Sequence, residues 1–249
     1  MAKMDIQKIR EKLDAVKNRG SKTWKPKLDH DTLARVVPME DGDSFKSFHF
    51  HYNVGAQGLL CPKRNFDEPC AICTFASKLY NDGDPESQAM AKKLFARQRF
   101  YSPIILREDK EPIVRVWGYS QTVYETLLKK CLNPKYGDIT DPEMGADFTI
   151  TYEKPAGKLY PNTNLDFDPP GTPLVAGKDS AKKTKELLES IPDFDSLFER
   201  KTPAEVADAL EAFMAGGGSS DDGEGTEKYA GANGDSSSSS VDSAVDDLT

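Results

Sequence analysis

Three cysteines and two histidines lie close together in the sequence and could bind a metal ion. Cys70 and Cys73 form a Cys-x-x-Cys turn, Cys61 precedes them, and His49 and His51 lie further upstream. Such a turn brings two thiolates to one ion, and a third thiolate with one imidazole completes a closed tetrahedral site. Soft sulfur ligands with one nitrogen favour zinc over magnesium or calcium. The spacing therefore predicts one structural Zn²⁺, in preference to a redox pair or inert thiols.

The imidazole ligand can be either of two histidines. If this segment is a strand, His49 and His51 point to the same face, so both stay open as ligands. We favour His51 because it is nearer the turn at residues 53–55. The fourth cysteine, Cys131, shares an apolar helical stripe with Leu127, so we expect it in the core.

A catalytic metal site is a poorer interpretation of the same residues. Pro69-Cys70-Ala-Ile-Cys73 matches half of the zinc deaminase motif, which also needs a glutamate two residues after its first ligand. The residues two past His30, His49 and His51 are Thr, His and Asn, and Cys61 would close the fourth coordination position. A phosphate-binding loop, an H-E-x-x-H motif and a G-x-S-x-G elbow are also missing. We therefore expect a binding protein, not an enzyme.

Cations and aromatic rings occur together in three segments. Residues 92–101 contain four cations and three aromatic rings, residues 115–119 alternate Arg, Trp and Tyr on one strand face, and residues 63–66 lie inside the metal loop. Cations neutralise phosphates and rings stack on unpaired bases, as single-strand binding without sequence preference requires. Alternatively, the rings are strand core and the cations flank them in solvent. The predicted DNA-binding residues are Lys63, Arg64, Phe66, Lys92, Lys93, Arg97, Arg99, Phe100, Tyr101, Arg115, Trp117 and Tyr119.

Short strands and a few helices are expected to position these residues. Aromatic and β-branched segments bounded by Gly, Pro, Asn and Asp predict strands, and apolar residues at helical spacing predict helices. The pattern of residues 24–160 predicts a small barrel or sandwich with insertions, and residues 161–173 are predicted to be a loop. The predicted strands are 45–52, 100–106, 113–119 and 148–154, and the predicted helices are 70–79, 88–96, 122–132, 181–191 and 203–214.

Charge is distributed unevenly along the chain. The net charge is −8, but residues 1–27 hold nine basic and three acidic residues, while residues 216–249 hold eight acidic and one basic. Residues 5–19 form a basic amphipathic pattern, either a surface helix or an arm that docks on a neighbouring protein or on phosphates. The Gly- and Ser-rich end is expected to be disordered and able to compete with DNA for a basic groove. We expect neither a membrane span nor a secretory signal.

In the order of these parts the chain resembles the single-stranded DNA-binding (helix-destabilising) protein of T-even-type tailed bacteriophages. Residues 99–106, 114–118 and 145–150 resemble segments of that family, and residues 236–248 resemble its C-terminal tail. The resemblance implies an α+β, mainly β fold: an OB-fold-like five-stranded barrel with a zinc-binding subdomain, flanking helices and a disordered acidic tail. It divides the chain into an arm (1–23), a core (24–215, zinc insertion about 49–80) and a tail (216–249).

Membership would imply a protein that cooperatively coats single-stranded DNA, without sequence preference, during phage replication, recombination and repair in the cytoplasm of the infected bacterial host. The arm would contact the neighbouring protomer, and the tail would contact the polymerase, the recombinase mediator and the helicase loader. Carried over by motif, the zinc ligands are His51, Cys61, Cys70 and Cys73, and Phe100, Tyr101 and Trp117 are candidate base-stacking positions. The alternative function is a zinc-stabilised protein–protein adaptor that does not touch DNA.

Overall fold

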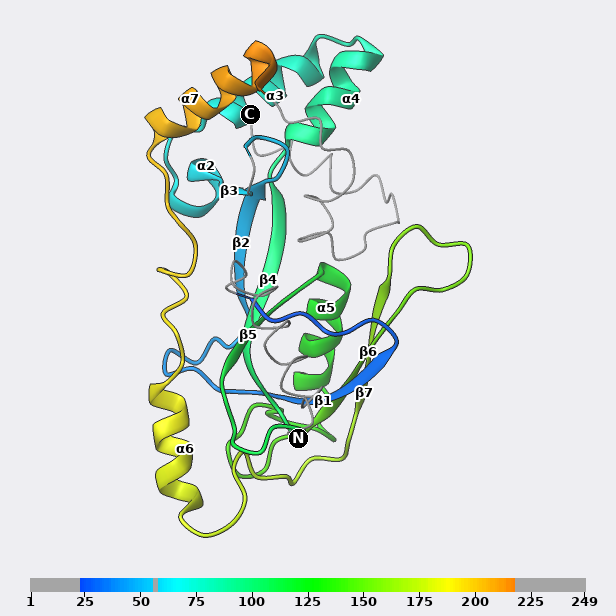
Figure 1. The fold of residues 1–249 in the computed structure, drawn as a ribbon, viewed down its shortest axis with the longest axis vertical. Helices are drawn as coiled ribbons and strands as arrows, with labels where there is room; N and C mark the ends of the chain where they lie inside the picture. The colour runs from blue at the N-terminus through cyan, green and yellow to red at the C-terminus, as the bar shows by residue number, and fades with distance from the viewer. Residues whose placement is uncertain (1–22, 56–57, 218–249) are drawn as a thin grey trace, which may run out of the picture.

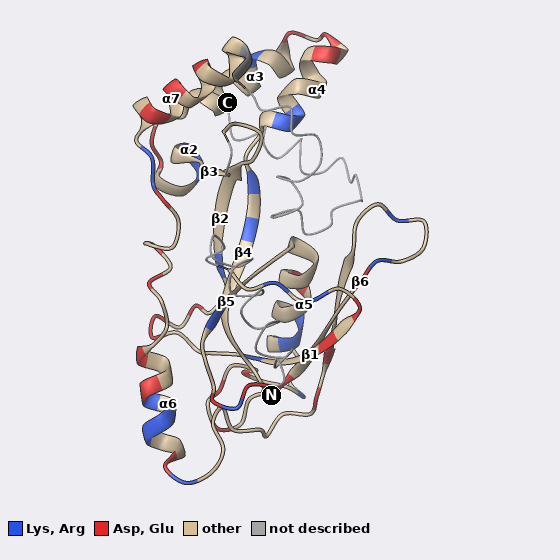
Figure 2. Cartoon of the chain, viewed as in Figure 1, with Lys and Arg blue, Asp and Glu red and all other residues tan. Residues whose placement is uncertain are grey.

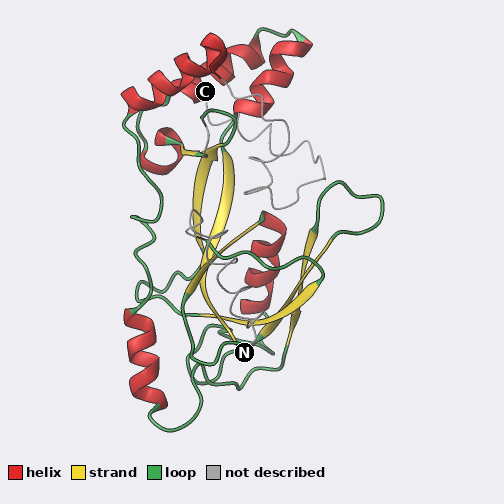
Figure 3. Cartoon of the chain, in the orientation of Figure 1, coloured by secondary structure: helices red, strands yellow, loops and turns green. Residues whose placement is uncertain are grey.

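One antiparallel sheet with helices at its ends and on its faces makes up the described part of the chain (Figures 1 and 3). The structure is a computed structural model that describes residues 23–55 and 58–217. The strands are β1 (His30–Val36), β2 (Lys46–His51), β3 (Leu59–Leu60), β4 (Arg97–Leu106), β5 (Arg115–Tyr119), β6 (Phe148–Glu153) and β7 (Asn162–Phe167). The helices are α2 (Pro62–Phe66), α3 (Ala71–Asn81), α4 (Pro85–Leu94), α5 (Gln121–Cys131), α6 (Ser180–Glu189) and α7 (Pro203–Ala212), with a π-helical turn, η1 (Phe213–Gly217). None of these helices has the length and apolar character that a membrane crossing requires.

The strands form an open sheet in the order β3-β2-β4-β1-β6-β7, with β5 paired to β4. Strand β4 organises the sheet: β2 pairs with residues 97–101, β1 with residues 104–106, and β5 with residues 100–104 on the opposite edge. Because β3 and β7 end the path without pairing to each other, the closed five-stranded barrel expected from the family resemblance is not what these strands form. The mixed α/β composition and the antiparallel pairing agree with the expectation.

Both faces of β4 are covered. Phe100 and Ile104 pack with Val123 of α5 on one face. Tyr101 packs on the other face with Phe194 and with its neighbours in the segment that joins α6 to α7. Every residue of β4 from Phe100 to Leu106 is therefore buried, while the first residues of the strand stay at the surface.

Most elements predicted from the sequence are present. The predicted strands correspond to β2, β4, β5 and β6, and the predicted helices correspond to α3, α4, α5, α6 and α7. Helix α7 begins with a reciprocal capping box, in which Thr202 and Glu205 each accept a hydrogen bond from the other's backbone N–H, and Pro203 takes the first helical position. These residues satisfy backbone groups that the first turn leaves unpaired, which is why the start was visible in the sequence.

Four elements were missed, among them the two-residue strand β3. Residues 162–167, expected to be loop, form β7, which pairs with β6 along its whole length. Asn and Asp disfavour strands, but Leu165 and Phe167 of this segment alternate toward the main core, and burial outweighs intrinsic propensity. Strand β1 and the short helix α2 were also not predicted. The expected arm (1–23) and tail (216–249) lie almost entirely outside the described residues, so these boundaries remain predictions.

A buried ion cluster ties two loops to the sheet. Arg35 of β1 is fully buried and donates to Asp147 at 3.3 Å, and Arg107 donates to both carboxylate oxygens of Asp147 at 3.0 and 2.8 Å. Arg35 also donates to the Asp141 carbonyl, and Arg107 to the Leu174 carbonyl. One carboxylate therefore holds two guanidinium groups, which in turn hold residues 141 and 174.

Replacing Asp147 should lower the free energy of unfolding more than replacing a surface acid does. Asp147→Asn leaves two guanidinium groups without their counter-charge, and breaking a buried pair costs about 3–5 kcal/mol of folding free energy. Urea denaturation measures this loss. Asp166→Asn on the exposed face of β7 is the matched control and should change stability by less than about 0.5 kcal/mol. Equal stabilities for the two variants would contradict the assigned role.

Candidate metal centre and basic strip

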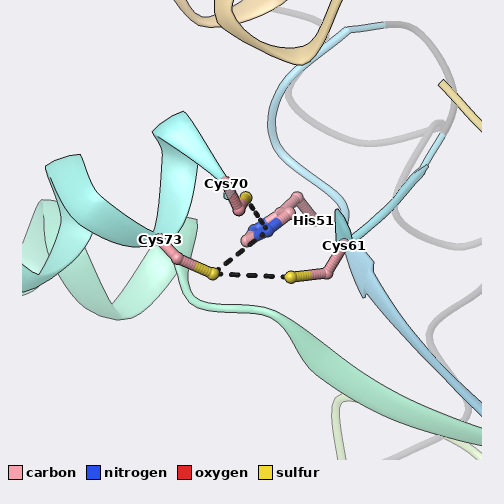
Figure 4. A group of neighbouring side chains, drawn as sticks. All are labelled: His51, Cys61, Cys70 and Cys73. Atoms are coloured by element: carbon pink, nitrogen blue, oxygen red, sulfur yellow. Dashed lines mark hydrogen bonds between the residues drawn. The ribbon is translucent and has the colours of Figure 1, made fainter. Parts of the chain in front are cut away.

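One imidazole and three thiols converge at a single point above the end of β2. Nε2 or Nδ1 of His51 and the sulfurs of Cys61, Cys70 and Cys73 all lie within 4.8 Å of one another (Figure 4). The Sγ atoms of Cys61 and Cys73 are 3.4 Å apart, and His51 Nε2 is 3.4 and 3.6 Å from the sulfurs of Cys70 and Cys73. A tetrahedral metal with sulfurs at 2.3 Å and a nitrogen near 2.0 Å implies ligand separations of about 3.5–3.8 Å. The four donors therefore fit one closed tetrahedral metal site.

Backbone elements hold each donor in place. His51 ends β2, Cys61 is the N-cap of α2, and Cys70 is the N-cap of α3, which places Cys73 in the first turn of that helix. His51 Nδ1 lies 2.7 Å from the Leu94 carbonyl oxygen. A proton on Nδ1 that is donated to this carbonyl leaves Nε2 free to bind a metal, as is usual for histidine ligands.

Asn65 ties the ligand loop to the sheet. Its side-chain oxygen accepts from the His49 backbone N–H at 2.9 Å, and its side-chain nitrogen donates to the carbonyls of His49 and Cys61 at 2.8 and 2.9 Å. Sequence analysis missed Asn65 and the Leu94 carbonyl. A supporting role for Asn65 could have been suspected because it lies between two cysteine ligands in the sequence. The role of the Leu94 carbonyl could not, because any residue has a backbone carbonyl.

The charges in the cluster favour a bound cation. Burial lowers the pKa of His51, but the nearby sulfurs of Cys61 and Cys70 outweigh it and raise that pKa to about 9. Hydrogen bonds from Cys61 and Cys73 lower the pKa of Cys70, whereas the same neighbourhood raises the pKa of Cys73. One thiolate thus forms easily and the next is opposed by it. A divalent cation removes this conflict because it stabilises every thiolate at once.

The other candidates of the sequence analysis lie outside the cluster. His49 is half-buried, and burial, Arg64 and His51 lower its pKa. The cluster contains His51, as the sequence analysis favoured. Cys131 packs against the main core through α5, as expected.

Loss of one thiol should release the metal. Cys70→Ser replaces a thiolate with a weak ligand, so we expect less than one bound metal per chain by elemental analysis. We also expect a melting temperature about 5–10 °C lower, since about 1 kcal/mol shifts it by about 2–4 °C at this size. Cys131→Ser is the matched control outside the cluster and should keep the metal. A metal content equal in both variants would contradict the assignment.

Four of the predicted DNA-binding cations form what we call the basic strip: Lys92 and Lys93 in the last turn of α4, and Arg97 and Arg99 at the start of β4 (Figure 2). Lys92, Lys93 and Arg97 are exposed, and Arg99 is half-buried over the Tyr52 ring. Within residues 23–55 and 58–217, none of the four makes an ion pair.

The predicted stacking rings are in the interior. Phe100, Tyr101, Trp117 and Tyr119 are 1–5% exposed. Phe100 and Trp117 belong to the cluster under α5, and Tyr101 packs against Phe198 with ring centroids 4.9 Å apart. In this conformation no base can reach these rings, so the alternative that they are strand core describes them correctly. The sequence pattern was misinterpreted for a physical reason. Alternation along a strand predicts which side chains share a face of the sheet, but it does not predict whether another element covers that face.

The remaining predicted residues have partners within the chain or lie on α2. Arg115 is paired with Asp109, and the Arg200 guanidinium lies 4.1 Å above the Phe66 ring. Lys63 and Arg64 are exposed in α2. The three segments predicted to form one DNA-binding surface thus separate into the basic strip, the core and the metal loop.

The loop between β6 and β7 carries cations and a ring that sequence analysis missed. Residues 154–161 contain Lys154, Lys158 and Tyr160 and no acidic residue. Tyr160 is 46% exposed, more than any other aromatic side chain in the described ranges. The signal was the Lys-Pro-Ala-Gly-Lys-Leu-Tyr-Pro segment, of which only the first residue was assigned to a strand and only the last to a loop.

The comparisons with known proteins agree with this combination of features. No curated protein matches the chain at a significant level. The family described as gp32 DNA binding protein like matches residues 30–215, which include the whole metal cluster, the basic strip and the β6–β7 loop. Its members are DNA-binding proteins and not enzymes, in agreement with the expectation from the sequence. The chain therefore belongs to the gp32-like family of DNA-binding proteins.

Proposed function

We propose that this protein binds single-stranded DNA without sequence preference and coats it during phage DNA replication, recombination and repair. The observation that carries this proposal is the basic strip, four cations at the junction of α4 and β4 that no acidic residue of the described chain neutralises. Phosphate groups are the natural partners of such cations, and their neutralisation releases counterions whatever the base sequence.

The basic strip contrasts with the other cations of the sheet. Lys46 is paired with Asp41 and Asp43, and Arg107 is paired with Asp147. Arg115 and Arg200 are also paired with carboxylates. These cations are already neutralised within the fold and contribute little attraction for phosphates. Of the cations within the described strands, only Arg97 and Arg99 of the basic strip are therefore left without an ion pair.

We infer that the β6–β7 loop is a second contact. Tyr160 replaces the buried rings as the candidate for base stacking, because its ring is exposed and follows two lysines in the same loop. Pro155 and Pro161 restrict the backbone of the loop, and Lys154 and Lys158 supply phosphate contacts. A ring and cations on one exposed loop are the combination that single-strand binding uses.

We assign Zn²⁺ to the metal centre, with His51, Cys61, Cys70 and Cys73 as ligands and a structural role. Three sulfurs and one nitrogen are a structural zinc set, and four protein donors leave no position for substrate or water. The ion would hold the ends of β2, α2 and α3 together. Asn53 of the same segment donates to the Lys93 carbonyl at 2.6 Å, which connects the metal centre to the basic strip.

The two ends of the chain are assigned from their charge. We propose that the basic arm (1–23) contacts the neighbouring protomer on the DNA, and that the acidic tail (216–249) competes with DNA and recruits replication proteins. The tail carries a net charge of −7 and the arm is strongly basic. A tethered polyanion reaches a high effective concentration at a cationic surface.

Salt titration of DNA binding tests the basic strip. We expect labelled oligo-dT to bind more tightly than duplex DNA of the same length, by fluorescence anisotropy. Arg97→Ala should reduce the slope of log K against log salt by about 0.7, the value for one lost phosphate contact on a single strand. Lys182→Ala is the control, since that lysine lies on α6 and is paired with Glu186. A slope unchanged by Arg97→Ala, or equal binding of both DNA forms, would argue against the proposal.

Substitutions at Tyr160 test the stacking contact separately. Tyr160→Ala should weaken oligo-dT binding by about 1–3 kcal/mol, which is the usual contribution of one stacked base. Tyr160→Phe keeps the ring and should keep the affinity. If the two variants bind alike, Tyr160 does not stack on a base.

A further inference from the structure

Helix α7 packs directly on the elements that carry the metal ligands. Val206 is fully buried and Leu210 nearly so, and both belong to one apolar cluster with Cys61 and Cys70. Partly buried Cys73, Ala209 and Phe213 border the same cluster. Figure 1 shows α7 lying across α3 at the end of the molecule that holds the metal centre. The apolar face of helix α7 thus packs in the same cluster as the cysteine ligands.

A second contact from the same segment holds the loop between two of the ligands. Arg200, two residues before the N-cap of α7, donates to Glu68 at 2.6 Å and covers the Phe66 ring at 4.1 Å. Glu68 and Phe66 lie between Cys61 and Cys70 in the sequence. The chain therefore contacts the ligand loop twice, once through the side chain of Arg200 and once through the apolar face of α7.

These contacts come from residues that are remote in sequence from the ligands. Donors on β2, α2 and α3 meet only when the loop is closed, and Asn65 closes it from the sheet side. Arg200 and α7 close it from the outside. Any contact that forms only in the closed conformation raises the affinity for the metal, and by thermodynamic linkage the metal stabilises that contact by the same amount.

We propose that residues 200–213 are a positioning segment of the metal centre: they retain the metal by holding the ligand loop closed, and loss of the metal releases α7. This inference rests on the proposed metal occupancy and is independent of DNA binding. The first acidic residue of the tail (216–249) is Asp221, four residues after the end of η1. Release of α7 would therefore also release the part of the fold to which the acidic tail is attached.

Zinc release from the full-length protein tests this proposal. The rate of transfer to a chromophoric chelator is measured for Arg200→Ala and Val206→Ala. Replacing residues that support metal ligands lowers the affinity for the metal about 10- to 100-fold, and we expect release to be faster by about the same factor. Glu211→Ala, on the exposed face of α7, is the matched control and should release zinc at the wild-type rate. Arg200→Lys keeps the charge opposite Glu68 and should restore part of the retention.

Arg200 is a surface residue, so its variant should fold even if Val206→Ala is strongly destabilised. Wild-type release rates in the Arg200 and Val206 variants would overturn the proposal. The reverse direction is measured by limited proteolysis: removal of zinc from the wild-type protein should expose residues 200–217 to cleavage. Protection that is unchanged by zinc removal would overturn the proposal. A purified chain that binds no zinc would overturn the metal assignment and this inference with it.

Discussion

The structure depends on the burial of both faces of strand β4. Helix α5 covers one face, so Phe100 and Ile104 enter the cluster beneath it. On the other face, Tyr101 enters the cluster around Phe194 and Ile105 enters a third cluster. Only the first residues of the strand, 97–99, extend beyond helix α5 and the segment around Phe194. The same strand is therefore a cationic surface at its beginning and hydrophobic core along the rest of its length. This division decides which of the predicted DNA-binding residues a nucleic acid can reach.

The metal centre adjoins the exposed end of that strand. His51 lies beside the Leu94 carbonyl and Asn53 beside the Lys93 carbonyl, at 2.7 and 2.6 Å. Both carbonyls belong to the last turn of α4, which carries Lys92 and Lys93 and leads into β4. A metal that orders His51 therefore also orders the backbone from which Lys93 and Arg97 project. In our proposal, an ion bound at this site would therefore support DNA binding without touching the DNA.

The charges of the body fall into two groups with different physical roles. The Arg35–Asp147–Arg107 cluster is largely buried and paired, and it fixes loops to the sheet. The basic strip is exposed at Lys92, Lys93 and Arg97 and lacks acidic partners among the described residues, so its charge is available to a ligand. A whole-chain charge of −8 conceals this arrangement, because much of the negative charge lies in residues 216–249.

The sequence by itself determined the features that depend on local spacing. The metal cluster followed from the Cys-x-x-Cys turn, an upstream cysteine and a histidine at the end of a predicted strand, because ligand chemistry requires these residue types whatever the fold. Helix α7 followed from Thr202, Pro203 and Glu205, which satisfy backbone groups locally. Only the tertiary structure decided which aromatic rings are accessible. Trp117 and Tyr160 are both aromatic residues with basic residues nearby in the sequence. Whether other elements cover such a ring depends on contacts between residues far apart in the chain.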